Sequence, residues 1–225
     1  FALRPGMKVG LYGGSFNPAH DGHAHVAETA KRRLGLDRVI WLVSPQNPLK
    51  DPSETGEYAA RLAYTRLIAK HPRFVVTDIE KQMGARTTAE TLRGLAPLMS
   101  RAHFVWIMGA DSFASLHRWH DWLEIARTLP LAVLARPGFS LRALGGPAAT
   151  RFSECQVPTH LAPRLATARP PAWCFIPMPL RPESSTAIRR RSARSLGTRN
   201  DTRTSYVPGA STRCWVVQGL GVVEG

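Results

Sequence analysis

Short apolar runs recur along the chain, and a longer stretch with helical periodicity follows each of the first four. Each run has the length of a strand and is rich in aliphatic, β-branched and aromatic residues. Strands that alternate with helices indicate βα units, in which neighbouring strands run parallel. The alternation therefore predicts an α/β fold built on a mainly parallel sheet. The expected strands are 8–12, 38–43, 73–78, 103–108, 131–135 and 173–177.

The segments between these runs have the spacing of amphipathic helices. We expect helices over 22–34, 57–70, 87–99 and 111–127, and a loop with one short helix between 137 and 171. Gly35 is a natural C-terminal stop for the first of them. The apolar face of the second would comprise Ala59, Leu62, Ala63 and Leu67.

The composition indicates a globular chain with a basic surface. Of the 225 residues 44% are hydrophobic, which is enough for a core. No apolar run approaches the roughly 18 residues that a membrane span needs. The three cysteines are widely spaced without a CxxC pair, so we expect no disulfide framework, no zinc ribbon and a reducing cytoplasm. The net charge of +14 favours polyanionic partners, which leaves nucleotides, nucleic acid and acidic lipids open.

The stretch "MKVGLYGGSFNPAHDGHAHVAETAKRRLGL" (7–36) places a glycine-rich turn between the first strand and the first helix. In α/β proteins this arrangement binds phosphate, because N–H groups of the turn and of the helix N-terminus point at the anion. Gly13 and Gly14 would let a ligand approach without a clash with a Cβ atom. Neither the G-x-G-x-x-G pattern nor the P-loop pattern is present, so the turn must work differently.

His20 and His23 flank Asp21 and Gly22 where the first helix is expected to begin. Residues three apart share a helix face, so both imidazoles could flank a phosphate beside the helix N-terminus. A metal site is one alternative, although His23 and His25 would point apart and no third ligand is evident. Solvent-exposed histidines without a ligand are the other. The phosphate interpretation is favoured over both.

The segment "GGSFNPAHDGH" resembles the signature of the HxGH nucleotidyltransferases, and further segments narrow the resemblance to the bacterial nicotinate-nucleotide adenylyltransferases. Together the matching segments cover most of 7–191, which we expect to form the nucleotidyltransferase domain. Residues 192–225 would pack on the same domain as a small C-terminal helical part, or be partly disordered. The segments, in the family's order, are "PQNPLK" (45–50), "TDIEKQMGARTTAETL" (77–92), "WIMGADSFASLHRWHDW" (106–122), "LARPGF" (134–139) and "SSTAIR" (184–189).

The resemblance implies a doubly wound, Rossmann-like nucleotidyltransferase fold. It also implies transfer of the adenylyl group of ATP to nicotinate mononucleotide, with Mg²⁺ accompanying ATP. A mononucleotide phosphate has a second pKa near about 6, so it is largely dianionic and needs no general base. The protein must mainly align two anions and stabilise charge, so we expect no catalytic triad and no protein ligands for a metal.

The resemblance further implies roles for individual residues. The residues expected to act on the transferring phosphates are His20, His23, Lys50 and Arg189. The residues expected to hold ATP are Gly13, Gly14, Ser15, Phe16, Asp111, Ser185 and Thr186. The residues expected to frame the nicotinate ring are Thr87, Thr88 and Trp119, with Trp119 stacked on it.

Other interpretations stay open. Trp119 and Trp122 are three apart in an expected helix and could both belong to the core, Lys50 could be an ordinary loop charge, and Asp111 could merely cap a helix. The acceptor could be nicotinamide mononucleotide or phosphopantetheine instead. A basic nucleic-acid-binding protein is a different class, but no binding motif supports it, so no specific nucleic acid is expected as a partner. No membrane partner is expected, and a monomer and a homodimer are equally compatible with the sequence.

Overall fold

The computed structural model describes residues 2–45, 55–179, 185–186 and 188–189. The predictions for Lys50 and for the C-terminal part, 192–225, fall outside these described residues. Within the described ranges, no helix is both long enough and apolar enough to cross a membrane.

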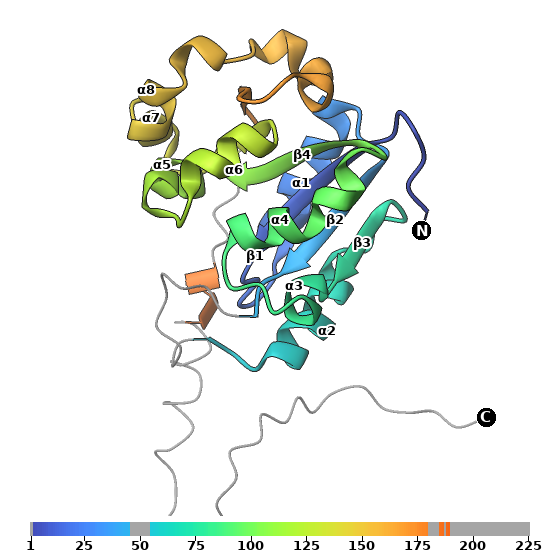
Figure 1. The fold of residues 1–225 in the computed structure, drawn as a ribbon. Coiled ribbons are helices and arrows are strands. Elements are labelled where there is room, and N and C mark those ends of the chain that lie inside the picture. The colour runs from blue at the N-terminus through green and yellow to red at the C-terminus, as the bar shows by residue number, and fades with distance from the viewer. Residues whose placement is uncertain (1, 46–54, 180–184, 187, 190–225) are drawn as a thin grey trace, which may run out of the picture.

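A six-stranded parallel sheet forms the centre of the fold, in the order β3-β2-β1-β4-β5-β6. Figure 1 labels β1, β2, β3 and β4 of this sheet. Each predicted strand is present with its ends within two residues of the expected bounds. The order reverses between β1 and β4, which is the arrangement of a doubly wound sheet, so the predicted fold class is confirmed. The strands are β1 (Lys8–Gly14), β2 (Arg38–Val43), β3 (Phe74–Thr77), β4 (His103–Gly109), β5 (Leu131–Leu134) and β6 (Trp173–Ile176).

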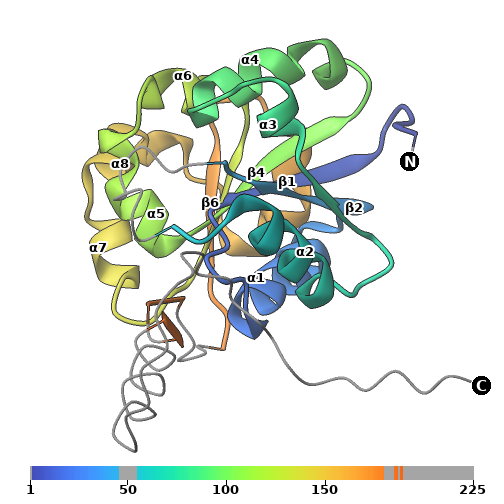
Figure 2. The same cartoon turned by 90° about the horizontal axis from the view of Figure 1, so that it is seen from below.

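Helices cover both faces of this sheet (Figure 2). The helices α1 (Asp21–Leu34) and η4 (Thr159–Thr167) pack on one face, and α4 (Thr88–Met99) and α6 (Trp122–Thr128) pack on the other. The remaining helical elements are α2 (Tyr58–Ile68), α3 (Ile79–Gln82), α5 (Ala110–Ser115), η2 (Leu116–Arg118), α7 (Ser140–Leu144), α8 (Pro147–Arg151) and η3 (Ser153–Cys155).

Two apolar cores lie on the opposite faces of the sheet, because successive strand residues point to opposite sides. In β4, Val105 and Ile107 belong to the core beneath α1 and η4, whereas Trp106 and Met108 belong to the core beneath α4, α5 and α6. Burial on both faces explains why the strands read as continuous apolar runs.

Local sequence signals define the ends of the two helices nearest the site. Gly35 ends α1 with φ 64°, a left-handed conformation that glycine adopts without a steric penalty. Thr87 caps α4, since its Oγ1 accepts from the Glu90 N–H at 3.3 Å while the Glu90 carboxylate accepts the Thr87 N–H at 3.3 Å.

The prediction of a single helix over 111–127 is wrong. The chain forms α5, continues into η2, breaks, and starts again as α6. At the break Asp121 has φ 52°, a left-handed conformation that ends the helical path. Trp119 therefore stands at the break while Trp122 opens α6, and the two side chains do not share a helix face.

Two further expectations are wrong. The segment 137–171 holds α7, α8, η3 and η4 rather than one short helix. The apolar face predicted for α2 also differs, because Leu62 is buried but Ala59 and Ala63 are exposed and Leu67 is 62% exposed. The other buried side chains of α2 are polar, namely Arg61 and Thr65.

Candidate active site

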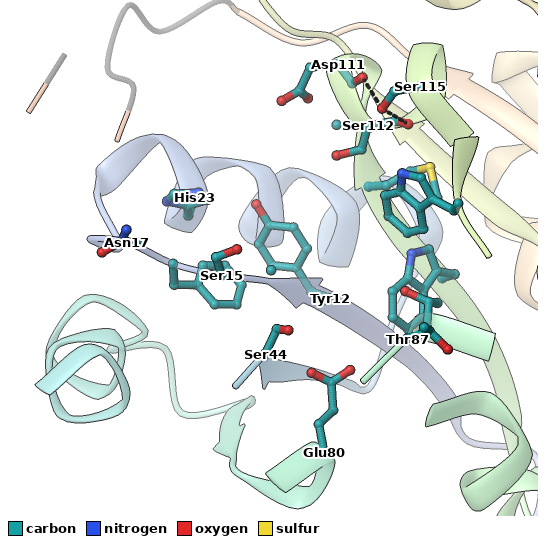
Figure 3. A pocket seen from close by; sticks show the side chains of 18 of the residues that line it. Tyr12, Ser15, Asn17, His23, Ser44, Glu80, Thr87, Asp111, Ser112 and Ser115 are labelled. Carbon is teal, nitrogen blue, oxygen red and sulfur yellow. Dashed lines mark hydrogen bonds between the residues drawn. The ribbon is translucent and has the colours of Figure 1, made fainter. Parts of the chain in front are cut away.

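A pocket of about 670 Å³ opens at the carboxyl ends of the strands. It lies where the strand order reverses between β1 and β4, which is where open α/β sheets bind ligands. Side chains from β1, α1, α3 and α5 surround it (Figure 3). The volume falls in the range of roughly 300–1,000 Å³ that small-molecule sites occupy.

Gly13 and Gly14 line the pocket as the last residues of β1, whereas the sequence placed them in the following loop. A Cβ on Gly13 would lie 2.6 Å from Cζ2 of Trp106, and a Cβ on Gly14 would lie 3.0 Å from Cζ of Phe16. Phe16 itself has φ 43°, which is strained for a bulky residue. The strand thus ends in a tight turn, with Ser15 and Phe16 also on the pocket wall.

The two histidines of the opening motif lie side by side, as their spacing predicted, with ring centroids 3.9 Å apart. His23 lines the pocket. His20 is the N-cap of α1, is only 6% exposed and is not part of the pocket wall. The backbone N–H of His20 donates to Nδ1 of His23 at 3.2 Å. His25 points elsewhere, since its Nε2 lies 3.1 Å from the carbonyl oxygen of Pro179.

The C-terminal signature reaches the same loop from a distant part of the chain. Oγ of Ser185 donates to the carbonyl oxygen of Pro18 at 3.0 Å, and Nη1 of Arg189 donates to that of Asn17 at 2.7 Å. Ser185 lines the pocket, whereas Thr186 is exposed, and neither Thr186 nor Arg189 is part of the pocket wall. The described part of "SSTAIR" is therefore held against the turn that follows β1.

Thr87, Thr88 and Trp119 line the pocket at its opposite end, together with Glu80 of α3. Glu80 is 6% exposed and accepts a hydrogen bond from Oγ1 of Thr91 at 2.9 Å. Burial raises the pKa of Glu80, and the Thr91 hydroxyl opposes this shift. The Thr87 N–H donates to the Glu90 carboxylate in the α4 capping box, so this N–H is already engaged within the protein.

Asp111 and Arg136 form a polar pair on the pocket wall. Nε of Arg136 lies 3.8 Å from Oδ1 of Asp111, and neither atom has a hydrogen bond with the described residues. Asp111 does not cap α5, since the N-cap is Gly109 and no side-chain cap bond forms. A buried donor and a buried acceptor that lack partners are suited to the hydroxyls or phosphates of a nucleotide.

The chemistry of the pocket suits a magnesium ion that arrives with its substrate. No group of three or more His, Cys, Asp or Glu side chains in the described ranges could hold a metal. Mg²⁺ commonly keeps several waters and binds through one or two carboxylates plus substrate phosphates. Asp111 is a pocket carboxylate that is partly exposed and could take that part.

Comparison with known proteins settles the family. The Cytidylyltransferase-like family model matches residues 11–191. A probable nicotinate-nucleotide adenylyltransferase of Caulobacter sp. (strain K31) is 52% identical over 188 residues, which span 84% of this chain and 100% of that protein. Another, of Roseobacter denitrificans (strain ATCC 33942 / OCh 114), is 48% identical over 188 residues, or 84% of this chain and 94% of that protein. The chain belongs to the nicotinate-nucleotide adenylyltransferase family.

The resemblance noted in the sequence is thereby confirmed. A solved structure also shares the fold of this protein. Plasmodium falciparum nicotinic acid mononucleotide adenylyltransferase, complexed with NaAD, superposes with a TM-score of 0.61 at 15% identity. The match covers 82% of this chain and 83% of that chain.

Sequence reasoning missed several residues that line this adenylyltransferase pocket. Most lie at or just beyond the carboxyl end of a strand, so the predicted strand ends could have been used to find them. Arg136 is an example, since it follows β5 inside the segment "LARPGF" that was noted without a role. The missed wall residues include Tyr12, Asn17, Ser44, Glu80, Trp106, Met108, Ser112, Ser115, Arg118 and Arg136.

Proposed function

We propose that this protein transfers the adenylyl group of ATP to nicotinate mononucleotide, which yields deamido-NAD and pyrophosphate. The observation that carries the proposal is the position of His23 on the wall of a pocket of about 670 Å³, beside the glycine turn and with its ring centroid 3.9 Å from that of His20. The names of relatives such as the Caulobacter protein, about half identical to this chain, supply the acceptor.

The reaction is a displacement at phosphorus. The phosphate of nicotinate mononucleotide attacks the α-phosphorus of ATP in line, a P–O bond forms to the α-phosphorus, and the bond to the leaving pyrophosphate breaks. The nucleophile is already ionised at neutral pH, so no side chain has to remove its proton. The work of the protein is alignment and stabilisation of negative charge.

His23 is suited to stabilise charge on the α-phosphate. Its Nδ1 accepts the N–H of His20, so the neutral ring carries its proton on Nε2, where it can donate to a phosphate oxygen. The backbone N–H of His20, behind the pocket wall, fixes the orientation of that ring. This differs from the direct phosphate contact that the resemblance implied for His20, and we assign it a positioning role.

ATP would lie along the turn that follows β1, where Asp111 could accept from a ribose hydroxyl and Arg136 could donate to a phosphate. Ser185 and Arg189 hold the turn through the carbonyl oxygens of Pro18 and Asn17. Mg²⁺, where it accompanies ATP, would neutralise charge on the triphosphate.

The nicotinate ring would lie at the α4 end of the pocket, against Trp119, Thr87 and Thr88. The first N–H groups of a helix lack intrahelical acceptors and carry a partial positive charge. The N-terminus of α4, which Thr88 opens, is therefore a favourable place for the ring carboxylate. This favours nicotinate over nicotinamide as the acceptor. We also place the protein in the cytoplasm, where Cys155 and Cys174, both free, would remain reduced.

The proposal is tested by product formation. Purified protein with ATP, Mg²⁺ and nicotinate mononucleotide should release pyrophosphate and form the dinucleotide, faster than with nicotinamide mononucleotide or phosphopantetheine. His23→Ala should lower turnover by about 10²–10³, the typical effect of losing one charge-stabilising donor. His25→Ala is the matched control on the same helix and should turn over normally. Near-normal turnover of His23→Ala would refute the role of the imidazole pair.

A further inference from the structure

Arg61 is buried beside the active-site pocket although it belongs to neither the pocket wall nor any motif used above. It lies in the first turn of α2 and is 4% exposed, and it is the one arginine among the buried polar side chains of the described ranges. A fully buried arginine is costly unless its donors are satisfied. Its contacts therefore indicate what it is retained for.

The Arg61 guanidinium donates to four backbone carbonyl oxygens from three separate segments. Nη1 donates to Ser15 at 2.5 Å and to Ser44 at 2.9 Å, Nη2 donates to Pro45 at 2.7 Å, and Nε donates to Gly56 at 2.9 Å. No carboxylate of the described residues forms an ion pair with it. The side chain thus ties the end of β1 and the end of β2 to the start of α2.

The tied segments form part of the pocket. Ser15 and Ser44 both line it, and Ser15 precedes the strained turn at Phe16. In a planar trans peptide the N–H points opposite to the C=O. Because the Ser15 carbonyl oxygen is bound by Arg61, the N–H of Phe16 is turned away from Arg61. A second tie joins the same segments, since the Gly56 N–H donates to Oδ1 of Asn17 at 3.1 Å.

We propose that Arg61 is a positioning residue that holds the Gly13–Asn17 turn against the segment after β2, so that the two reacting phosphates are aligned. The inference rests on the proposed adenylyl transfer. Arg61 does not touch the substrates itself. The donors of a guanidinium are spread over three nitrogens in a rigid plane, and Arg61 uses all three, whereas the three donors of an ammonium share one nitrogen, so lysine cannot replace it.

The first test compares Arg61→Lys and Arg61→Gln with Arg66→Lys and Arg66→Gln, which alter an exposed arginine on the same helix. Both Arg61 variants should lose roughly 10- to 100-fold in kcat per folded molecule with a smaller change in KM, because a misplacement of about 1 Å can cost 10²-fold in rate. The Arg66 variants should keep the wild-type kcat and KM. Millimolar guanidinium, but not ammonium, should partly restore Arg61→Ala.

The outcomes separate the two proposals. If the wild-type protein forms no dinucleotide, the proposed function fails. If it does, and Arg61→Lys keeps the wild-type kcat, or the loss only follows the folded fraction seen in thermal melting, the positioning role is overturned.

A measurement on the wild-type protein covers the case in which the Arg61 variants do not fold. The Nε–H resonance of Arg61 can be assigned through the Tyr58 ring, whose centroid lies 5.3 Å from Cζ. Binding of ATP–Mg²⁺ should shift this resonance, since the ligand would contact the turn that Arg61 holds. An unchanged resonance at saturating ATP–Mg²⁺ would contradict the inference. The measurement uses ATP–Mg²⁺ alone and does not require nicotinate mononucleotide.

Discussion

The substitution Gly13→Ala tests whether the end of β1 is packed as tightly as the pocket geometry requires. The new Cβ would lie 2.6 Å from Cζ2 and 2.7 Å from Cη2 of Trp106, a side chain that is 2% exposed. Carbon atoms in favourable contact are about 3.5–4.0 Å apart, so about 1 Å has to be recovered by moving the indole or the strand. Trp106 packs in the core on one side and lines the pocket on the other, so the indole can relieve the clash only by shifting toward the pocket.

The expected cost follows from these distances. Overpacking a core costs about 1–3 kcal/mol, and the lower entropy of the unfolded chain returns about 0.4–1 kcal/mol for a glycine-to-alanine change. The midpoints of these two ranges leave a net loss in the free energy of unfolding of about 1.3 kcal/mol. For a chain of this size each kcal/mol lowers Tm by about 2–4 °C, so Tm should fall by roughly 3–5 °C. Gly145→Ala is the control, since the nearest atom to its new Cβ would be the Leu141 carbonyl oxygen, 3.4 Å away.

A double-mutant cycle identifies the cause. Trp106→Phe removes the two indole carbons that the new Cβ would meet, at the cost of a cavity. In the combined variant Gly13→Ala/Trp106→Phe the clash is absent, so urea unfolding should show less destabilisation than the sum of the single changes, by about 0.5–2 kcal/mol. Additive changes would refute the reasoning, and so would a Gly13→Ala protein that melts like the wild type.

The remaining predictions concern the α4 end of the pocket. Burial raises the pKa of Glu80 above its ordinary value of 4.5, so the folded state holds this proton more tightly than the unfolded state. The stability that follows is present below about pH 4.5 and is lost as the pH rises through the raised pKa. Glu80→Gln should remove this dependence of the free energy of unfolding on pH, as measured by urea unfolding at a series of pH values. If the variant and the wild type showed the same pH profile, the raised pKa of Glu80 would be excluded as its cause. Trp119→Ala should raise KM for nicotinate mononucleotide by roughly 2- to 10-fold, from an aromatic contact of about 0.5–1.5 kcal/mol, and leave KM for ATP unchanged. An equal rise in both KM values would argue against ring stacking.

The strands could be predicted because the signal for each is local, and their parallel direction could be predicted from their alternation with helices. A run such as Arg38–Val43 is apolar on both faces, and this pattern matches a strand covered by helices on both sides. The break at Asp121 could not be predicted, because an aspartate with φ 52° has no distinctive sequence context. The buried face of α2 was predicted wrongly because only apolar residues were considered for it, whereas Arg61 is buried and binds carbonyl oxygens that lie mostly in other parts of the chain.

The candidate site divides in the same way. His20 and His23 could be paired from their spacing, since three residues of helix set both the distance and the face. Their unequal depth could not be predicted, because it depends on how the turn after β1 sits on the rest of the fold.

The register of the sheet shows why Arg61 carried no sequence signal. Gly14 pairs with Val43, so the chains that leave β1 and β2 emerge next to each other, and the Ser44 N–H donates to the Gly14 carbonyl oxygen at 3.0 Å. The carbonyl oxygens of the next residues, Ser15 and Ser44, then fall within reach of one guanidinium. Backbone carbonyls are present at every position, so no residue type marks the acceptors. The role of Arg61 can therefore be recognised only when the three-dimensional arrangement of the strands is known. Its removal should disturb the turn after β1, on which the position of His23 depends.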